Sequence, residues 1–403
     1  MKEIAVIGMG YIGLPTATLV AHHGYKVYGI DINSQVVSQI NNAILPFHEP
    51  GLEELLKVAV KQNHLIASSV VVNAECYLIV VPTPFDQNNK PDTSYVKNAI
   101  RSILPYLDEG DLVIIESTCP VGTTKKMMEF IYESKPELKD KLYMSYCPER
   151  VIPGNIVKEL VDNDRVIGGI NDKSADRAAK FYKTFVKGEL HTTNSQTAEM
   201  CKLVENSSRD IQIALANELS IICDKSNINI WELIELANKH PRVNILKPGC
   251  GVGGHCIAVD PYFIIADHPN DTKLIGAARK INNYKALWCI EKIHNTFLNF
   301  EKINNKKAKL AFMGLAFKPD VDDLRESPAS YITSQVLDLL PIQNHLVVEP
   351  NLSEHELYDL VDYDIAINEA DIIIYLVAHK EFQSSQIHPN KIVLDFCGVN
   401  QNI

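Results

Sequence analysis

A cysteine that follows a glycine-rich run is the residue best placed to act as a nucleophile. Residues 249–261 read GCGVGGHCIAVDP, with Cys256 after the glycines and Asp260 four residues further on. Such a cluster indicates that the backbone approaches something closely, because glycine loses much conformational entropy on folding. If a helix begins here, Cys256 lies near its positive end, where a thiolate is favoured, and Asp260 shares its face. Cys250 is the second candidate.

A thiolate nucleophile suits the oxidation of a primary alcohol to an acid. One hydride transfer gives an aldehyde, which the thiolate traps as a thiohemiacetal; a second gives a thioester, which water hydrolyses. The alternative is a structural cysteine, the ordinary state of a reduced, buried thiol. The nine cysteines are scattered and form no CxxC pair or zinc-like spacing, so we expect no metal site.

A stripe of polar residues marks one face of a predicted long helix. Residues 196–223 contain neither proline nor glycine and show helical periodicity. One face of this helix carries residues at i, i+3, i+7 and i+10: Glu199, Lys202, Asn206 and Arg209. The lysine and the asparagine could stabilise an oxyanion or an alkoxide. The alternative, a solvated face with a Glu–Lys pair, is slightly favoured by the pattern alone.

Further candidates lie on short loops. Glu149 follows an expected strand in the segment CPER and is a candidate base for the attacking water. Several cations in CPER, HPRVN and FKPDVDDLRES could hold a sugar or its phosphates, although each could equally form a surface salt bridge: Arg150, His240, Arg242, Lys318 and Arg325.

A glycine motif near the N-terminus indicates a dinucleotide site. Residues 8–13 read GMGYIG, directly after an expected strand and before a helical run. In this context Gly8 permits a tight turn, Gly10 lets a phosphate approach the helix N-terminus, and Gly13 lets helix and strand pack. Asp31 ends the next strand, where a carboxylate binds a ribose 2′-OH and repels a 2′-phosphate. The motif therefore predicts NAD rather than NADP, with FAD as a weaker alternative.

Two threonines follow further strands at the edge where ligands bind in parallel sheets. Thr83 lies in VPTP and Thr118 in ESTCPVG, and either could contact the nicotinamide ribose or a catalytic water. The neighbouring prolines could simply end the strands, which would explain the prolines but not the threonines.

Two series of short apolar strands must position these residues. The first series is expected at 3–7, 26–30, 77–81, 112–116 and 143–146, and the second at 308–313, 345–349, 371–377 and 391–395. Alternation with helical segments is typical of parallel, doubly wound sheets. We expect two Rossmann-like α/β domains, 1–194 and 301–403, joined by a helical segment, 195–300, that carries catalytic residues. Its long helix needs further cover, which predicts a dimer interface.

Composition excludes several classes of partner. The 403 residues carry a net charge of −11, with 46% hydrophobic and 22% charged residues. A chain this acidic has no general attraction for nucleic acid or anionic membranes. No stretch approaches the ~20 apolar residues of a membrane span. The apolar run at the N-terminus enters a glycine turn at once, so we interpret it as a buried strand rather than a signal peptide and expect a cytoplasmic protein.

At these residues the sequence resembles the UDP-sugar 6-dehydrogenases, the family of UDP-glucose dehydrogenase. The resemblance covers nearly the whole chain and rests on motifs in the family's order: GMGYIGLP, VPTP, ESTCPVGT, PER, EMCKLVEN, GVGGHCIAVDP and FKPDVDDLRES. Other segments resemble the branch that acts on UDP-N-acetyl-D-mannosamine: TAEMCKLVENSSRD, HPRVNILKPG and GGHCIAVDPYF. Cys250 departs from the family, which usually has proline or an aromatic residue there.

The resemblance implies a role for each matching position. The catalytic residues would be Cys256, Lys202, Asp260, Asn206, Glu149 and Thr118. The NAD contacts would be the motif glycines together with Tyr11, Ile12, Asp31, Thr83, Thr118 and Arg325. Contacts with the nucleotide sugar, some of them from a partner subunit, would be Arg150, Val151, Lys202, Asn206, Arg209, His240, Arg242, Gly253 and Lys318.

The implied reaction is the four-electron oxidation of the C6 alcohol of UDP-N-acetyl-D-mannosamine by NAD in a homodimer or larger oligomer. The same chemistry on UDP-N-acetylglucosamine or UDP-glucose stays open, because the residues do not fix one stereocentre of the sugar. Two rivals remain: a two-electron dehydrogenase of the hydroxy-acid type, and a non-catalytic protein that only binds NAD.

Overall fold

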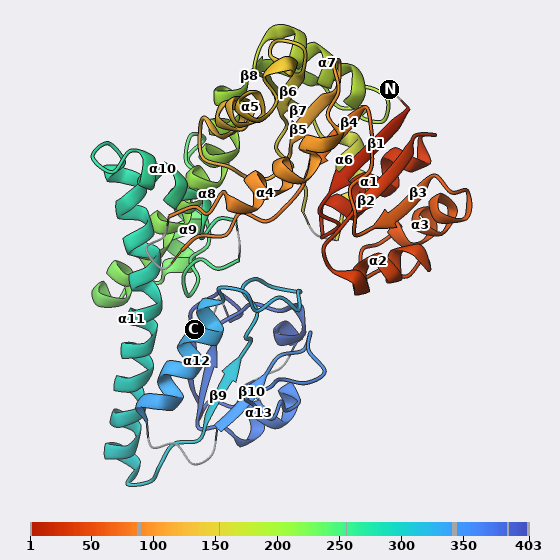
Figure 1. Ribbon diagram of the computed structural model, residues 1–403. Helices are drawn as coiled ribbons and strands as arrows, with labels where there is room; N and C mark the ends of the chain where they lie inside the picture. Colours follow the sequence, from red (N-terminus) through yellow and green to blue (C-terminus); the bar gives the residue numbers. More distant parts are fainter. Residues whose placement is uncertain are drawn as a thin grey trace. The chain divides into compact units, whose positions relative to one another are not determined.

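The computed structural model of the protein describes residues 2–86, 90–152, 154–254, 256–340, 345–384 and 387–400. The chain divides into two compact units, Met1–Val204 and Glu205–Ile403. Both are α/β units whose parallel strands alternate with helices (Figure 1). This confirms the predicted fold class. The predicted division into three domains at 194 and 300 stays a prediction.

The first unit is built on one large sheet. Within the described residues its strands are β1 (Glu3–Ile7), β2 (Lys26–Ile30), β3 (Leu65–Ser68), β4 (Cys76–Ile79), β5 (Leu112–Ile115), β6 (Tyr143–Tyr146), β7 (Arg165–Gly169) and β8 (Leu190–Asn194). They lie in the order β3-β2-β1-β4-β5-β6-β7-β8, and the β6–β7 pair is antiparallel. The helices are α1 (Gly13–His22), α2 (Ser34–Asn41), α3 (Leu52–Lys61), α4 (Ser94–Ile103), α5 (Thr123–Ser134), α6 (Ile156–Asp162) and α7 (Asp172–Tyr182).

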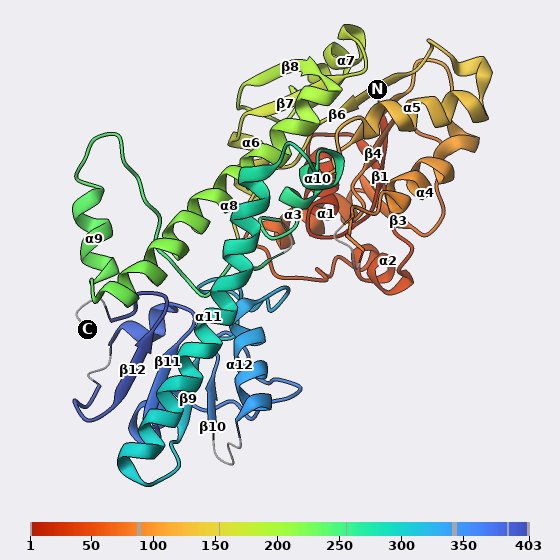
Figure 2. The ribbon, with the colours of Figure 1, turned by 90° about the vertical axis from the view of Figure 1, so that its left-hand side faces the viewer.

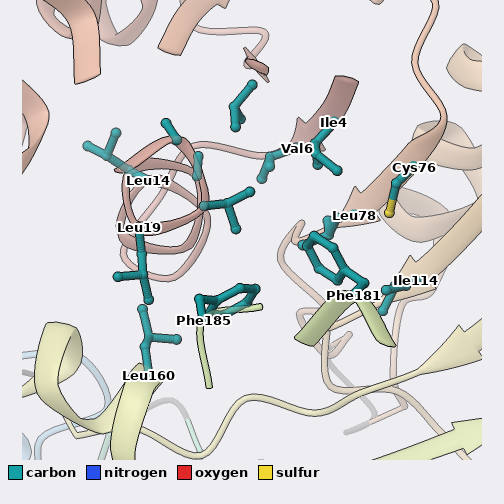
Figure 3. Packing of buried hydrophobic residues seen from close by; sticks show 14 of the residues in the cluster. Ile4, Val6, Leu14, Leu19, Cys76, Leu78, Ile114, Leu160, Phe181 and Phe185 are labelled. Carbon is teal, nitrogen blue, oxygen red and sulfur yellow. The ribbon is translucent and has the colours of Figure 1, made fainter. Parts of the chain in front are cut away.

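Alternate side chains of each central strand bury themselves on opposite faces of this sheet. On one face, Val6 and Leu78 pack against α1 and α7, where Leu14 and Phe181 point into the same cluster (Figure 3). On the other face, α4 and α5 cover the sheet with apolar residues such as Ile100. Because helices cover both faces, the ligand-binding groups of such a sheet lie at the ends of its strands.

The first series of strands is confirmed, with ends that shift by at most two residues. The prediction missed β3, β7 and β8. β8 reads LHTTN and lies at one edge of the sheet with its residues largely exposed, so it lacks the apolar run that marks a buried strand. β7 reads RVIGG, and its charged first residue and two final glycines interrupt the same signal.

The second unit contains a smaller parallel sheet in the order β10-β9-β11-β12. Its strands, all predicted, are β9 (Leu310–Met313), β10 (His345–Val348), β11 (Ile372–Tyr375) and β12 (Ile392–Asp395). One face packs on α11 (Lys273–Asn304) and α12 (Pro328–Leu339), and the other on α13 (Tyr363–Glu369). Two shorter helices complete this unit, α9 (Ile230–Ala237) and α10 (Asp260–Asp267); Figure 2 shows α11 beside the small sheet. Short 3-10 turns span Leu104–Tyr106, Pro136–Leu138 and Lys380–Ser384.

The predicted long helix is confirmed as α8 (Ser195–Ser226), which follows β8 directly. Its residues up to Val204 belong to the first unit and those from Glu205 to the second. None of the helices in the described ranges combines the length and apolar character that crossing a membrane requires.

A buried polar network joins α8 to α11 within the second unit. Arg279 Nη1 donates to Asp210 Oδ1 at 2.6 Å, and Asn282 Nδ2 donates to the same oxygen at 2.8 Å. Asn217 Nδ2 donates to Asn282 Oδ1 at 2.9 Å, while Asn217 Oδ1 accepts from the backbone N–H of Gly249 at 2.9 Å. The network thus links two helices to the loop that leads to Cys256.

We expect Asp210→Ala to destabilise the second unit by about 3–5 kcal/mol, because it leaves the buried Arg279 guanidinium without its anion. Asp224→Ala is the matched control, since Asp224 pairs with Lys292 across the same two helices but at about one-third exposure. Its loss should stay within about 1 kcal/mol. Calorimetric unfolding of both variants measures the difference, and equal losses would contradict the assignment.

Candidate active site

The glycine motif forms the turn between β1 and α1. Gly8 adopts a φ of +100°, and a Cβ there would lie 2.4 Å from the carbonyl oxygen of Val80. A Cβ on Gly13 would lie 1.8 Å from the oxygen of Gly8. By contrast, a Cβ on Gly10 would meet nothing within 4 Å. The fold itself therefore requires Gly8 and Gly13 but not Gly10. At Gly10 the backbone is exposed and the space in front of it is open.

The N-terminus of α1 suits an anion. Its N-cap residue, Ile12, makes no side-chain capping hydrogen bond. The first backbone N–H groups of an uncapped helix, together with its dipole, attract a phosphate. Nearby, Tyr11 is half-exposed and stacks on Phe47 with ring centroids 4.2 Å apart. The motif residues therefore fit a dinucleotide whose pyrophosphate rests against Gly10.

Asp31 lies just beyond β2, beside the same turn. Its Oδ2 accepts a hydrogen bond from the N–H of Met9 at 2.9 Å, and its Oδ1 accepts one from Asn33 at 2.8 Å. These bonds fix the half-buried carboxylate next to the glycine turn. This is the position from which an acidic residue meets the hydroxyls of a ribose.

Thr83 and Thr118 lie in the loops that follow β4 and β5. The Ser117 hydroxyl ties these loops together by donating to the carbonyl of Val81 at 2.7 Å. The hydroxyl of Thr83 is buried beside the Cys119 thiol, whereas Thr118 is half-buried. Burial raises the pKa of Cys119 far above its ordinary value, so that cysteine is an inert thiol.

Glu199 corrects the interpretation of the polar stripe as a solvated face. The residue is completely buried. Its carboxylate accepts hydrogen bonds from the N–H groups of Gly122 (2.5 Å) and Thr124 (2.7 Å) and from the Thr124 hydroxyl (2.6 Å). It therefore fixes the start of α5 on α8 rather than pairing with a neighbouring lysine at the surface. At the far end of the stripe, Arg209 is exposed.

Lys202 reaches the loop that follows β6. Its Nζ donates to the carbonyl oxygen of Glu149 at 2.8 Å. The Glu149 carboxylate turns inward and accepts from Arg165 Nη2 at 2.9 Å, with only 9% of the side chain exposed. Arg150 donates through Nη2 to the carbonyl of Asp164, and Val151 packs at the edge of the core. The structure thus brings Lys202 and Glu149 together, although the candidate base is engaged in an ion pair.

Cys256 lies close to the start of a helix. α10 begins at Asp260, and the cysteine lies in the turn just before it. The N–H of Asp260 donates to the Cys256 carbonyl at 2.8 Å, which places the carboxyl one turn from the thiol. Asp260 is buried and its Oδ2 accepts from Asn206 Nδ2 at 2.5 Å. Cys256 itself is half-buried. Cysteine, aspartate and asparagine therefore form one group within the second unit.

The glycines before Cys256 pack on the segment that carries Lys318 and Arg325. A Cβ on Gly253 would lie 2.5 Å from the carbonyl oxygen of Glu326, and the Gly254 N–H donates to the Arg325 carbonyl at 3.1 Å. The close approach expected from the glycines is therefore made, at least in part, to residues 317–328 of the same chain. Lys318 is half-buried, and Arg325 pairs with Asp323 at 2.6 Å.

His240 and Arg242 are exposed in the turn after α9, where the Arg242 N–H donates to His240 Nδ1 at 3.3 Å. The structure does not join them to the group around Cys256.

One group of potential metal ligands lies elsewhere in the described residues: Asp320, His379 and Glu381. His379 Nδ1 already accepts from the Asp320 N–H at 3.0 Å and lies 3.0 Å from Asn351 Nδ2. Its Nε2 lies 3.1 Å from the Glu349 carboxylate. The imidazole is thus engaged in holding the 317–328 segment, and the group carries no metal assignment.

Comparison with known proteins decides the family. Residues 2–186, 196–284 and 311–402 match the NAD binding, central and UDP binding domains of the UDP-glucose/GDP-mannose dehydrogenase family. The chain belongs to this family. It is an NAD-dependent dehydrogenase with a UDP binding domain, as the motifs predicted, and NAD is confirmed over FAD.

Relatives within the family are similar over almost their whole length. A UDP-N-acetyl-D-mannosamine dehydrogenase from Escherichia coli is 47% identical, covering 97% of each chain. An NDP-N-acetyl-D-galactosaminuronic acid dehydrogenase from Ralstonia nicotianae is 42% identical, covering 99% of this chain and 96% of its own. A solved UDP-N-acetyl-mannosamine dehydrogenase from S. aureus superposes with a TM-score of 0.89 at 38% identity, covering 99% and 95%.

The sequence analysis did not identify the buried residues that support the loop of Glu149. Arg165, Glu116 and Tyr182 are buried in one cluster beneath the loop of Glu149. An arginine at the head of the apolar run RVIGGI and a glutamate at the end of LVIIE were the available signals, since charged residues are rarely buried without partners.

We expect Gly10→Ala to weaken NAD binding by about 10–100-fold, because a methyl group fills space that a phosphate needs, at a cost of about 1–3 kcal/mol. Thermal stability should hold, since the added Cβ meets no protein atom. Gly276→Ala is the matched control, because its Cβ also meets nothing but lies on α11. Fluorescence titration with NAD measures both, and unchanged affinity in Gly10→Ala would refute the phosphate assignment.

Proposed function

We propose that the protein oxidises the C6 alcohol of UDP-N-acetyl-D-mannosamine to UDP-N-acetyl-D-mannosaminuronate, with the reduction of two NAD⁺. The chemistry rests on one observation: a half-buried cysteine one turn ahead of a buried aspartate that an asparagine of α8 holds. The choice of sugar rests on the 47% identical relative that carries this activity in its name. Membership in a family with NAD and UDP binding domains supports both halves of the proposal.

Cys256 acts as the nucleophile in this proposal. Its thiolate attacks the aldehyde formed by the first oxidation, and the new C–S bond gives a thiohemiacetal. The second oxidation removes hydride from that carbon and leaves a thioester, which water cleaves to release the thiol and the carboxylate. Each oxidation would use one NAD⁺ as hydride acceptor, with the first NADH exchanged for a second NAD⁺ between the two steps. Asp260, one turn away, exchanges the proton of the thiol or of the water.

Lys202 and Asn206 stabilise charge on the substrate oxygen. They are four residues apart on α8 and therefore project from the same face. Oxygen becomes negative in the alkoxide before hydride loss and in the tetrahedral intermediates of the thioester steps. An ammonium and an amide N–H held by a rigid helix stabilise that charge with little reorganisation. The resemblance assigns Glu149 the role of base for the hydrolytic water and assigns Thr118 a place around the same water.

The remaining predicted residues divide between cofactor and sugar. Asp31 would receive the ribose hydroxyls, with Gly8, Gly10 and Gly13 around the pyrophosphate. Other NAD contacts are assigned to Tyr11, Ile12, Thr83, Thr118 and Arg325. The UDP-sugar contacts are assigned to Arg150, Val151, Arg209, His240, Arg242, Gly253 and Lys318.

A homodimer is part of the proposal. Large apolar side chains of the second unit are about half-exposed on α8 and α9, among them Leu215, Ile222 and Leu236. Several exposed large apolar side chains on the helices of one unit favour a protein–protein contact there. The cytoplasm, where nucleotide sugars and NAD are available together, is the proposed location.

Substitution of the nucleophile tests the covalent chemistry. Cys256→Ser should abolish formation of the uronic acid, because a hydroxyl is a far weaker nucleophile than a thiolate at neutral pH. The wild-type protein should form two NADH per sugar oxidised. Product analysis by mass spectrometry with NADH absorbance measures both quantities.

Cys250→Ser is the matched control for that experiment. Cys250 is buried, and its Sγ donates to the Leu376 carbonyl at 3.3 Å, which a serine hydroxyl can replace. Burial raises the pKa of Cys250 well above its ordinary value, so it cannot supply a thiolate. Full acid formation by Cys256→Ser, or one NADH per sugar in the wild type, would overturn the proposal.

A panel of nucleotide sugars tests the substrate. We expect the highest kcat/KM with UDP-N-acetyl-D-mannosamine, and lower values with UDP-N-acetylglucosamine, UDP-glucose and UDP-N-acetylgalactosamine. The last sugar is included because of the 42% identical relative. NADH formation at a common sugar concentration gives the ranking. A preference for another sugar would replace the substrate while leaving the cysteine chemistry in place.

A further inference from the structure

Arg165 is a buried cation with no place in the chemistry above. Its side chain is only 4% exposed, and it lies at the first position of β7. A buried guanidinium is costly unless it is paired and hydrogen-bonded. Its partners therefore indicate what the residue holds in place.

The antiparallel strand pair brings Arg165 to Glu149. β6 and β7 pair with Ser145 opposite Gly169 and Tyr146 opposite Gly168. Continuing this register by three positions puts Glu149 opposite Arg165. If β7 ran parallel to β6, as β1 to β5 do, its first residue would lie at the opposite edge. The antiparallel β6–β7 pair thus places a cation at the edge where the loops of the site emerge.

Arg165 is fixed from several sides. Nη2 donates to Glu149 Oε2 at 2.9 Å and to the Leu160 carbonyl at 3.3 Å, and Nη1 donates to Cys147 Sγ at 3.9 Å. The guanidinium lies over the ring of Tyr182, 4.8 Å from its centroid. Hydrogen bonds along the edge of the planar guanidinium and the Tyr182 ring against its face together fix its orientation.

Glu116 is a second carboxyl in the same cluster. It is buried, and its Oε1 accepts from the Tyr182 hydroxyl at 2.5 Å. Burial raises the pKa of Glu116 to about 7, so below that pH it is largely neutral. The direct ion pair of Arg165 is with Glu149, at 2.9 Å, and this is the principal ion pair of the cluster.

Glu149 transmits this constraint to α8. One carboxylate oxygen accepts from Arg165, the other accepts from the N–H of Arg150 at 2.7 Å, and the backbone carbonyl accepts from Lys202 Nζ at 2.8 Å. The carbonyl that orients Lys202 thus belongs to a residue whose side chain is held at both oxygens.

We propose that Arg165 is a positioning residue that, through Glu149, sets the orientation of the Lys202 ammonium. The inference rests on the proposed function in one respect: it gives Lys202 its role at the substrate oxygen. With its side chain only 4% exposed, Arg165 is given no contact with substrate or cofactor in this proposal. It acts by fixing the Glu149 main chain, so that Lys202 is aimed before the substrate binds. A misplacement of about 1 Å at such a group costs about 100-fold in rate.

Arg165→Lys tests this role, because lysine keeps the buried charge but loses the planar fork. We expect kcat to fall about 100-fold, while the affinity for NAD and the KM for the UDP-sugar stay at wild-type values. Tyr182→Phe is the matched control from the same cluster. It removes the hydroxyl that Glu116 accepts from but keeps the ring under Arg165, so it should lower the melting temperature and leave kcat unchanged.

Coupling to Lys202 separates positioning from general damage. The first hydride transfer precedes the hydrolysis assigned to Glu149. Its rate in the double variant Arg165→Lys/Lys202→Ala should be no lower than in Lys202→Ala alone, because the residue that Arg165 acts through is already absent. Multiplicative losses in the double variant, wild-type kcat in Arg165→Lys, or an equal loss in Tyr182→Phe would each overturn the proposal.

A measurement that does not depend on turnover distinguishes failure of the positioning role of Arg165 from failure of the proposed function. Competitive acetylation with acetic anhydride, quantified by mass spectrometry, reports how firmly the Lys202 amine is held. We expect labelling of Lys202 to rise severalfold in Arg165→Lys and to stay unchanged in Tyr182→Phe. Unchanged labelling in Arg165→Lys refutes the positioning role. Increased labelling in a protein that oxidises no UDP-sugar supports that role and refutes only the proposed function.

Discussion

The hydrogen bonds that α8 makes through its buried and half-buried polar side chains are the constraint on which the candidate site depends. Glu199 binds the start of α5, Lys202 binds the Glu149 carbonyl, and Asn206 binds Asp260. These residues are three and four positions apart, so one rigid helix presents them along one face. Because α8 is continuous from Ser195 to Ser226, the spacing of these side chains along it is set by helix geometry and not by flexible loops.

Burial gives these polar contacts their stabilising effect. A buried polar group that loses its partner costs about 1–3 kcal/mol, and a buried charge costs more. Three residues are almost completely buried, and each is hydrogen-bonded or ion-paired: Glu199, Arg165 and Asp210. The segments that they bind therefore have few alternative positions. The same reasoning applies to Gly253 and Gly254, whose lack of side chains lets the Cys256 loop pack directly on residues 317–328.

Much of this arrangement could be predicted from local sequence. The turn at Gly8, the strand that ends before Asp31 and the uninterrupted helix through Lys202 each depend on neighbours within about one element. The rest depends on partners far away in the chain. The periodicity around Glu199 could not show that its partners lie some 75 positions earlier, at Gly122 and Thr124. Likewise, nothing near Arg165 indicates that β7 reverses direction and so meets Glu149.

In the proposed reaction, the sulfur of Cys256 carries the substrate as an acyl group. Rapid acid quenching during turnover, followed by peptide mass spectrometry, tests this most directly. We expect the peptide that contains Cys256 to gain the mass of a UDP-aminouronoyl group. This adduct should form only when both NAD⁺ and UDP-N-acetyl-D-mannosamine are present. Steady formation of the acid with no adduct on Cys256, or with the adduct on another cysteine, would contradict it.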